Sequence, residues 1–335
     1  MKKTILIALS IALTLTFTTC NKGGGGGGGG TDGTRSTGGG GGKGDLQKWT
    51  VVTDSTFDST ITAIAYGNNR FVAVGFRGKI AYSANGASWT AVSDSTFGRS
   101  HLTAIAYGNN RFVAGGQGKI AYSDDNGVTW TAVTNSELPT AAIAFGNNRF
   151  VAVGGSQIAY SDNGTSWTAV ADSTIWDYTY TFNNTTYTDK ADIQAIAYGN
   201  NRFVAVGTAG KMAYSANGTT WTAISDSTFG GSHIEGIAYG NNMFVAVGQG
   251  GKMAYSDDNG VTWTAVSSTG TISGIAYGNN RFVAGNSSGK IAYSDNGVTW
   301  TAVEDSKLSI ILDIAYGNNR FVAGDSLGKM AYADW

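Results

Sequence analysis

The chain has 335 residues, and its 22 Lys and Arg against 23 Asp and Glu give a net charge of −1. A nearly neutral chain lacks the basic field that nucleic-acid-binding proteins use, so we expect no nucleic-acid partner. Its single cysteine excludes an internal disulfide, so the stability of the fold must come from its packed core.

The first 19 residues have the pattern of an export signal. Lys2 and Lys3 precede a mostly apolar run from Ile5 to Phe17, which is too short to span a bilayer and typical of a secretory signal. Cys20 follows shortly after it. This arrangement resembles a bacterial lipoprotein signal, in which the thiol is lipidated and becomes the mature N-terminus. The alternative is an ordinary secretory signal with an incidental cysteine.

Residues 20–45 contain this cysteine and then almost only Gly, Thr, Ser and a few charges, with an unbroken run from Gly23 to Gly30. Such a segment cannot bury apolar side chains and is expected to act as a flexible tether. A tether of this length spans roughly 25–30 Å on average. We therefore predict an exported, membrane-anchored lipoprotein at the outer surface or in the periplasm, which contacts the membrane through its lipid anchor only.

Residues 46–335 repeat one phrase, Ile-Ala-Tyr-Gly-Asn-Asn-Arg-Phe-Val-Ala. Its aromatic third residue occurs at Tyr66, Tyr107, Phe145, Tyr198, Tyr239, Tyr277 and Tyr316. A period of about 40 residues built only from strand-like segments is typical of a β-propeller with one blade per repeat. The sequence therefore predicts an all-β fold, a seven-bladed β-propeller of four-stranded blades.

The two ends of the repeat region complement each other. The last repeat stops at Trp335, before its fourth strand, and the missing strand stands at the beginning as Trp49-Thr50-Val51-Val52. We therefore expect residues 49–52 to complete the last blade and to close the ring. Closure leaves only short outer edges, which limits aggregation between sheet edges.

The turn between the third and fourth strands has a recurring pattern. Residues 123–130 read Ser-Asp-Asp-Asn-Gly-Val-Thr-Trp, and residues 256–263 repeat them. Both segments resemble the Asp-box, or BNR, motif Ser-x-Asp-x-Gly-x-Thr-Trp, and two other blades carry versions that are one residue shorter. In that family the aspartate accepts backbone hydrogen bonds and the tryptophan packs beneath the turn. The resemblance implies a structural role for Asp125, Gly127, Trp130, Asp162, Trp167, Asp258, Gly260, Trp263, Asp295 and Trp300, whereas Ala84 and Ala216 replace the aspartate in two further blades.

Sialidases carry the same boxes, so a sialidase-like glycosidase is one alternative. That family shares an arginine triad, a tyrosine nucleophile with a glutamate partner, and an aspartate acid/base. Most arginines here are instead one repeated residue that opens the second strand, and Met243 replaces it in one copy. The two histidines occupy one equivalent position in two repeats, without the spacing of a catalytic triad or a metal site. We therefore expect no enzymatic activity, no cofactor and no metal.

The copies differ mainly in two connections, which join the second strand to the third and each repeat to the next. In an up-and-down blade both connections emerge on one face of the disc, and the uniform Gly-Asn-Asn turns lie on the other. A variable face on a uniform scaffold is typical of a binding surface, and free drift of loops is the alternative. The polar candidates for ligand binding on this face are Arg77, Arg99, His101, Gln117 and His233.

The longest departure from the repeat, at residues 175–187, lies on the same face. Aromatic residues alternate there with smaller polar ones, and Asn183-Asn184 marks a turn, so the pattern predicts a β-hairpin with one aromatic side. Aromatic rings stack on sugars and anchor protein interfaces. The candidate ligand contacts are therefore Trp176, Tyr178, Tyr180, Phe182 and Tyr187, and packing of these rings on neighbouring loops is the alternative.

These observations predict a monomeric, non-enzymatic propeller that binds a glycan or an extracellular or envelope protein, as an adhesin or lectin does. The first alternative is an envelope assembly or scaffold factor that docks protein clients, as propellers resembling photosystem assembly factors do. The glycosidase alternative requires an acid pair in the central mouth. Recent amplification of the repeat, with copy number or loops varying among relatives, is a further alternative.

Overall fold

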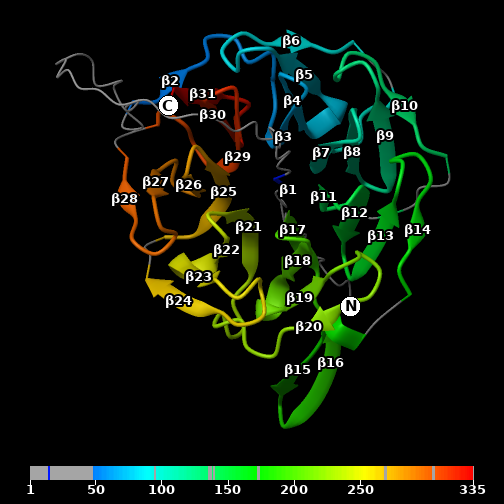
Figure 1. Cartoon of the computed structure of the whole chain (residues 1–335), viewed down its shortest axis with the longest axis vertical. Helices are drawn as coiled ribbons and strands as arrows, with labels where there is room; N and C mark the ends of the chain where they lie inside the picture. Colours follow the sequence, from blue (N-terminus) through cyan, green and yellow to red (C-terminus); the bar gives the residue numbers. More distant parts are fainter. Residues whose placement is uncertain are drawn as a thin grey trace, which may run out of the picture.

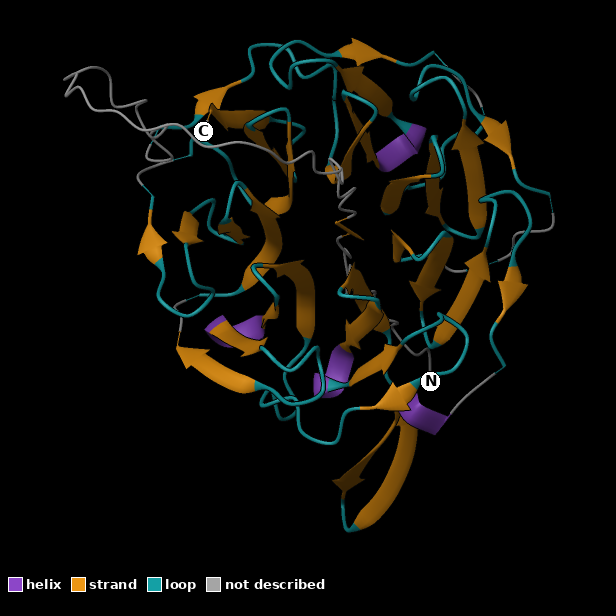
Figure 2. Ribbon diagram, viewed as in Figure 1, coloured by secondary structure: helices purple, strands orange, loops and turns teal. Residues whose placement is uncertain are grey.

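Seven four-stranded antiparallel sheets surround a central axis in the computed structural model (Figures 1 and 2). The structure describes residues 14–15, 48–93, 96–134, 138, 140–171, 174–267, 270–303 and 306–334. The predicted export signal, Cys20 and the glycine-rich tether lie outside the described residues, apart from β1 (Thr14–Leu15), which pairs in parallel with β17. Within these ranges no helix is long and apolar enough to cross a membrane.

The first four blades follow one another along the chain. Blade one contains β3 (Ile61–Gly67), β4 (Arg70–Gly75), β5 (Ile80–Ser83) and β6 (Thr90–Ala91). Blade two contains β7 (Ala104–Gly108), β8 (Arg111–Gly116), β9 (Lys119–Ser123) and β10 (Thr131–Ala132). Blade three contains β11 (Ala142–Gly146), β12 (Arg149–Gly154), β13 (Gln157–Ser161) and β14 (Thr168–Ala169). Blade four contains β17 (Ile193–Gly199), β18 (Arg202–Gly207), β19 (Met212–Ser215) and β20 (Thr222–Ala223).

The remaining blades complete the ring. Blade five contains β21 (Ile234–Gly240), β22 (Met243–Gly248), β23 (Lys252–Ser256) and β24 (Thr264–Ser267). Blade six contains β25 (Ile272–Gly278), β26 (Arg281–Asn286), β27 (Ile291–Ser294) and β28 (Thr301–Ala302). Blade seven contains β29 (Ile311–Gly317), β30 (Arg320–Asp325), β31 (Met330–Asp334) and β2 (Thr50–Val51). Four short 3₁₀ helices lie in the connections, namely η1 (Phe76–Gly78), η2 (Thr174–Trp176), η3 (Thr208–Gly210) and η4 (Gln249–Gly251).

The predicted closure of the ring is confirmed. β2 pairs antiparallel with β31, with Thr50 opposite Tyr332 and Val51 opposite Ala331. The N–H of Val52 also donates to the carbonyl of Met330 at 2.9 Å. Both ends of the repeat region therefore meet in blade seven, and the described strands from β2 to β31 form a closed ring.

The repeated phrase accounts for the inner half of each blade. Asn68 and Asn69 form the two-residue turn between β3 and β4, with φ angles of 45° and 59°. Two successive residues with positive φ are the mark of a type I′ hairpin turn, which Asn tolerates better than most residues. The second strand is apolar at consecutive positions because both of its faces are covered, so the side chains of Phe71 and Val72 are fully buried.

The Tyr-Gly pair of the phrase joins neighbouring blades. The glycine that ends each innermost strand lies under the aromatic ring of the next blade, so a Cβ atom on Gly146 would stand 2.0 Å from Cγ of Tyr198. The same contact joins Gly67 to Tyr107 and, across the closure, Gly317 to Tyr66. Only glycine allows this close approach, and the contact fixes the spacing of the inner strands around the axis.

Candidate functional site

The two variable connections of the repeat share one face of the disc, as predicted. In blade one, the N–H of Phe76 donates to the carbonyl of Thr60 at 3.0 Å, and the N–H of Leu102 donates to the carbonyl of Gly75 at 3.2 Å. The connection between β4 and β5 therefore touches both the link that precedes its blade and the link that follows it. We call this side the variable face.

The predicted hairpin rises from the link between blades three and four. It consists of β15 (Asp177–Phe182) and β16 (Thr185–Lys190), and it projects from the disc beside blade four (Figure 1). Asn183 and Asn184 form its turn with φ angles of 49° and 60°, as in the repeat. An ion pair of 3.3 Å between Asp177 and Lys190 holds its base.

One side of the hairpin is aromatic, which confirms the predicted alternation. Tyr180 lies opposite Tyr187, and their rings stack with centroids 5.4 Å apart and planes at 20°. Tyr178 lies 6.0 Å from Tyr180 between ring centroids. Tyr180, Phe182 and Tyr187 are 45%, 62% and 43% exposed, so these rings are available to a ligand. Burial raises the pKa of Tyr178, and the negative charges of Asp189 and Asp192 raise it further.

Trp176 is a correction to the sequence prediction. Its side chain is 1% exposed and packs in a core with Ile193 and Phe203, so it does not belong to the exposed aromatic side. The residue stands in η2, before the first strand of the hairpin, and its carbonyl accepts a hydrogen bond of 2.8 Å from the N–H of Ala191. The aromatic residues recur at every second position from Trp176 to Phe182, but Trp176 precedes β15, and its side chain points into the core.

A cleft of about 520 Å³ separates the hairpin from the loops of blade four. Tyr178 and Tyr180 form one wall, and η3 with the link to blade five, including Lys211 and Asp226, forms the other. The opposite wall is braced because Ser227 Oγ donates to the carbonyl of Gly210 at 2.6 Å. We call this space the hairpin cleft, and it offers aromatic surface together with one positive and one negative side chain.

The other predicted polar contacts gather elsewhere on the variable face. Gln117 Oε1 accepts a hydrogen bond of 2.8 Å from the N–H of His101, and the His101 ring lies edge-on to Phe76, with 4.1 Å between centroids. Arg77 and Arg99 are exposed on the connections of blade one. Blade one lies across the ring from the hairpin (Figure 1). The structure therefore does not join these residues and the hairpin into one site.

A polar cluster on blade five includes two residues that the sequence reasoning missed. Gln249 Nε2 lies 3.0 Å from Oε1 of Glu235 and 3.2 Å from Nδ1 of His233. Burial raises the pKa of Glu235, although Gln249 and His233 oppose this shift. The position of Glu235 is occupied in other repeats by Thr62, Gln194 and Ser273. This difference among the repeats is the sequence signal that could have singled out Glu235.

Sequence comparison assigns the repeats to a known family. A model described as the DUF6242 β-propeller domain matches residues 27–221 and 170–313, which together cover more than half of the chain. The chain belongs to this family. Curated protein sequences yield no match to this DUF6242 propeller.

Solved structures resemble the DUF6242 propeller in fold. YCF48 from Cyanidioschyzon merolae has a TM-score of 0.66 at 17% identity, with 85% of this chain and 98% of that chain covered. YCF48 bound to D1 peptide has a TM-score of 0.67 at 16% identity, with 86% and 94% covered. A computationally designed protein, Ika8, has a TM-score of 0.60 at 16% identity, with 83% and 97% covered. At such identities these likenesses show the fold alone.

The third turns of the DUF6242 propeller have the structural role predicted for the longer copies. Asp125 Oδ1 accepts hydrogen bonds of 3.1 Å and 2.9 Å from the N–H groups of Val128 and Thr129, and Trp130 Nε1 donates to the carbonyl of Gly127 at 3.2 Å. Asp258, Gly260 and Trp263 repeat this arrangement. The relation to the Asp-box family itself stays a prediction.

The shorter turns correct the sequence reasoning. In blade three Asn163, not Asp162, accepts the turn hydrogen bonds, which come from the N–H groups of Thr165 and Ser166 at 2.9 Å. Asn296 replaces Asp295 in the same way in blade six, while Trp167 and Trp300 keep their bonds to the turn carbonyls. Asn85 and Asn217 fill this position in the two blades where Ala84 and Ala216 were read as replacements of the aspartate. The acceptor is always two residues after the serine that begins the turn.

The repeated arginines clamp neighbouring blades together. Arg149 forms a two-point ion pair with Asp162, at 2.6 Å and 3.2 Å, and its guanidinium lies 4.4 Å from the ring centroid of Tyr160. Its Nη1 also donates to the carbonyl of Asn217 in blade four at 2.8 Å. Corresponding bonds to the next blade start from Arg70, Arg111, Arg202 and Arg320. These side chains are therefore part of the scaffold.

Proposed function

We propose that this chain is a non-enzymatic binding protein that holds a segment of another protein in the hairpin cleft. The observation that carries this proposal is the exposed aromatic side of the hairpin, which faces a cleft on the variable face. Tyrosine rings anchor protein interfaces because they bury a large area at a small cost in conformational entropy. Lys211 and Asp226 supply opposite charges for the backbone or side chains of an extended ligand.

The hairpin also offers hydrogen bonds to an extended chain. Among the described residues β15 and β16 pair only with each other, so each strand has an outer edge that another strand can join. Peptides commonly bind by adding a strand to such an edge, with pockets beside it reading alternate side chains. The likeness in fold to YCF48 bound to D1 peptide agrees with a protein ligand and supports it by analogy.

A glycan is the second candidate ligand. The stacked, half-exposed rings of Tyr180 and Tyr187 present flat apolar surface of the kind that sugar rings cover. A lectin would use these ring faces and would leave the outer strand edges free. The two ligands therefore differ in which part of the hairpin they need.

Residues 46–335 can test both ligands because they contain every strand of the closed ring. We would screen them on peptide and glycan arrays beside the double variant Tyr180→Ser/Phe182→Ser. The matched control is Leu327→Ser, which removes a side chain that is 63% exposed on blade seven. Peptide binding that is lost in the double variant and kept in the control supports the proposal. Glycan binding with the same dependence favours a lectin, and silence on both arrays contradicts the hairpin cleft as a binding site.

We further propose that the propeller is an exported monomer, anchored through lipid on Cys20. This proposal rests on the sequence of residues 1–45. Metabolic labelling with radioactive palmitate should mark the wild-type chain and not Cys20→Ser, and the label should follow the membrane fraction. Unlabelled wild-type chain contradicts the anchor and leaves the binding proposal standing. Sedimentation of residues 46–335 checks the monomer.

A further inference from the structure

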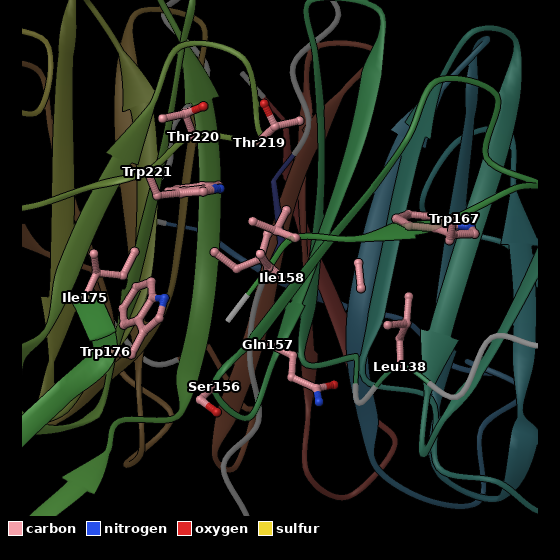
Figure 3. Close-up of a pocket in the computed structure, with 13 residues that line it drawn as sticks. Leu138, Ser156, Gln157, Ile158, Trp167, Ile175, Trp176, Thr219, Thr220 and Trp221 are labelled. Atoms are coloured by element: carbon pink, nitrogen blue, oxygen red, sulfur yellow. The ribbon is translucent and has the colours of Figure 1, made fainter. Parts of the chain in front are cut away.

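A second hollow lies on the outer side of blade three. It has a volume of about 730 Å³ and is formed by β13, β14, the links on both sides of the blade, and the third turn of blade four. Figure 3 shows Trp176 and Trp221 on one side, Leu138 and Trp167 on the other, and Ile158 between them. We call it the rim pocket. In the part of the chain that the structure describes, it shares no lining residue with the hairpin cleft.

Comparison among the blades shows which side chain differs beside this space. At several blade boundaries a hydrophobic side chain, which we call the plug, stands five residues after the Val or Ile at the end of the fourth strand, as Phe97 does after Val92. Phe97 is 2% exposed and meets Trp130 of the next blade edge-on, with 6.0 Å between ring centroids. Phe229 packs in one core with Trp263 of the next blade.

On both sides of the rim pocket the plug is aliphatic. Leu138 packs near Trp167, and Ile175 packs near Trp221. A branched aliphatic side chain fills less space than a phenyl ring and leaves the flat face of the tryptophan less covered. Ligand pockets typically have volumes of about 300–1,000 Å³, so the space that remains is large enough for an external ring with the groups beside it.

Trp176 adds a directed polar feature to this apolar space. Its Nε1 is buried and has no hydrogen-bond partner among the described residues. The six tryptophans that begin the internal fourth strands differ, because each donates Nε1 to the carbonyl of the glycine three residues earlier, as Trp221 does to Gly218 at 3.2 Å. In Figure 3 the nitrogen edge of Trp176 turns toward Ile158 and Gln157, into the pocket. A buried donor without a partner favours a ligand that brings an acceptor.

We propose that the rim pocket is a second binding site, which takes an aromatic side chain of a peptide while a peptide carbonyl accepts a hydrogen bond from Trp176 Nε1. The ring takes the place that Phe97 and Phe229 occupy at other blade boundaries. Among the described residues the lining carries no charged side chain, only apolar residues with Ser, Gln and Thr, and this lining suits a neutral ligand group. The site stands independently of the hairpin cleft.

The test follows the indole N–H signals of residues 46–335 by ¹⁵N NMR. The probe is N-acetyl-L-phenylalanine amide, and N-acetyl-L-alanine amide is the control that keeps the carbonyl and lacks the ring. The Trp176 signal, assigned from its loss in Trp176→Phe, should shift with saturation at a dissociation constant of about 1 mM. The alanine probe should leave that signal unmoved at the same concentrations.

Variants that fill the pocket separate binding from folding. Ile175→Phe restores the plug of other boundaries and should weaken the phenylalanine probe at least about tenfold, while the remaining indole signals keep their positions. Leu138→Phe fills the pocket from the opposite side, and it replaces Ile175→Phe in the experiment if that variant folds poorly. The hairpin variant Tyr180→Ser/Phe182→Ser should bind the probe normally, whatever the fate of the hairpin cleft. An unmoved Trp176 signal, an equal response to both probes, or full binding by the filled variants overturns the proposal.

Discussion

Replacing Arg149 by methionine tests whether the arginine clamps hold the ring together. Methionine is the natural residue at this position in blade five, where Met243 reaches the turn glycine of the next blade, Gly297. The substitution therefore keeps a long apolar stem and removes only the guanidinium. What is lost is the ion pair with Asp162, the contact with Tyr160, and the bond to the carbonyl of Asn217.

Three contributions set the expected magnitude. The ion pair is exposed, with side chains 24% and 65% accessible, so it contributes roughly 0.5–1 kcal/mol. The contact of the cation with the tyrosine ring adds roughly 0.5–1 kcal/mol, part of which the sulfur of methionine restores. The hydrogen bond to the carbonyl adds about 1 kcal/mol. We therefore expect Arg149→Met to lower the free energy of unfolding by about 1.5–2.5 kcal/mol.

Arg202→Met is the matched control, because Ala216 stands where Asp162 stands in blade three. Arg202 keeps the ring contact at 4.4 Å and the bond to the next blade at 3.0 Å. Its replacement should cost about 0.5–1 kcal/mol less than that of Arg149, and this difference should shrink in 1 M NaCl. It should also shrink as the pH falls below 3.8, because the hydrogen bond from Arg149 lowers the pKa of Asp162 and its protonation removes the pair.

Equilibrium unfolding in urea, followed by tryptophan fluorescence and by circular dichroism, measures these values. Coincident transitions of the two probes are needed before free energies are compared. A cost for Arg149→Met of less than about 0.3 kcal/mol would refute the clamp. Equal costs for both variants without dependence on salt would refute the assignment of the difference to the ion pair.

Three further predictions concern the scaffold and its carboxyl groups. Gly146→Ala should cost about 3 kcal/mol in urea unfolding because its Cβ meets the Tyr198 ring, whereas Gly231→Ala, which meets nothing within 4 Å, should be nearly neutral; equal effects contradict the Gly-Tyr contact. Burial opposes ionisation of Asp258, but hydrogen bonds led by Thr262 outweigh it and hold the pKa at about 2. Asp258→Ala should therefore cost about 1–2 kcal/mol at neutral pH, and the deficit should fade between pH 3.8 and 2; a deficit that does not change with pH argues against this. Burial raises the pKa of Glu235, so its stabilising share is present below pH 4.5 and is lost as the pH rises. The free energy of unfolding of Glu235→Gln should therefore rise relative to that of the wild type as the pH increases above 4.5. Profiles of unfolding free energy against pH that run parallel for the two proteins would contradict this prediction.

The repeat made the fold predictable from the sequence. Seven copies of one phrase defined the blades, and the tryptophan strand missing at one end and present at the other indicated the closure between β2 and β31. The hairpin was also predictable, because the alternation from Tyr178 to Phe182 and the Asn-Asn turn are local signals. Local patterns of this kind need no knowledge of distant contacts.

The errors arose where the role of a residue depends on turn length or distant packing. Asp162 shares its residue type with Asp125, but the turn is one residue shorter, so counting from the serine leads to Asn163. Trp176 continues the aromatic period, yet its environment is set by blades three and four, which no local pattern describes. The carbonyl that Arg149 contacts on the next blade belongs to a residue 68 positions further along the chain. The sequence of a single repeat therefore gives no sign of this contact.

The strand that closes the ring also determines when the molecule can be finished. β2 leaves the ribosome early, and its partner β31 lies at the opposite end of the repeat region. Blades one to six can pair their strands in the order of synthesis, but β2 must wait unpaired until nearly the whole chain has been made. A chain that stops before Met330 therefore releases an open ring with an orphan strand, which a protease or a second truncated chain can capture. Completion of the polypeptide is thus a condition for a sealed molecule.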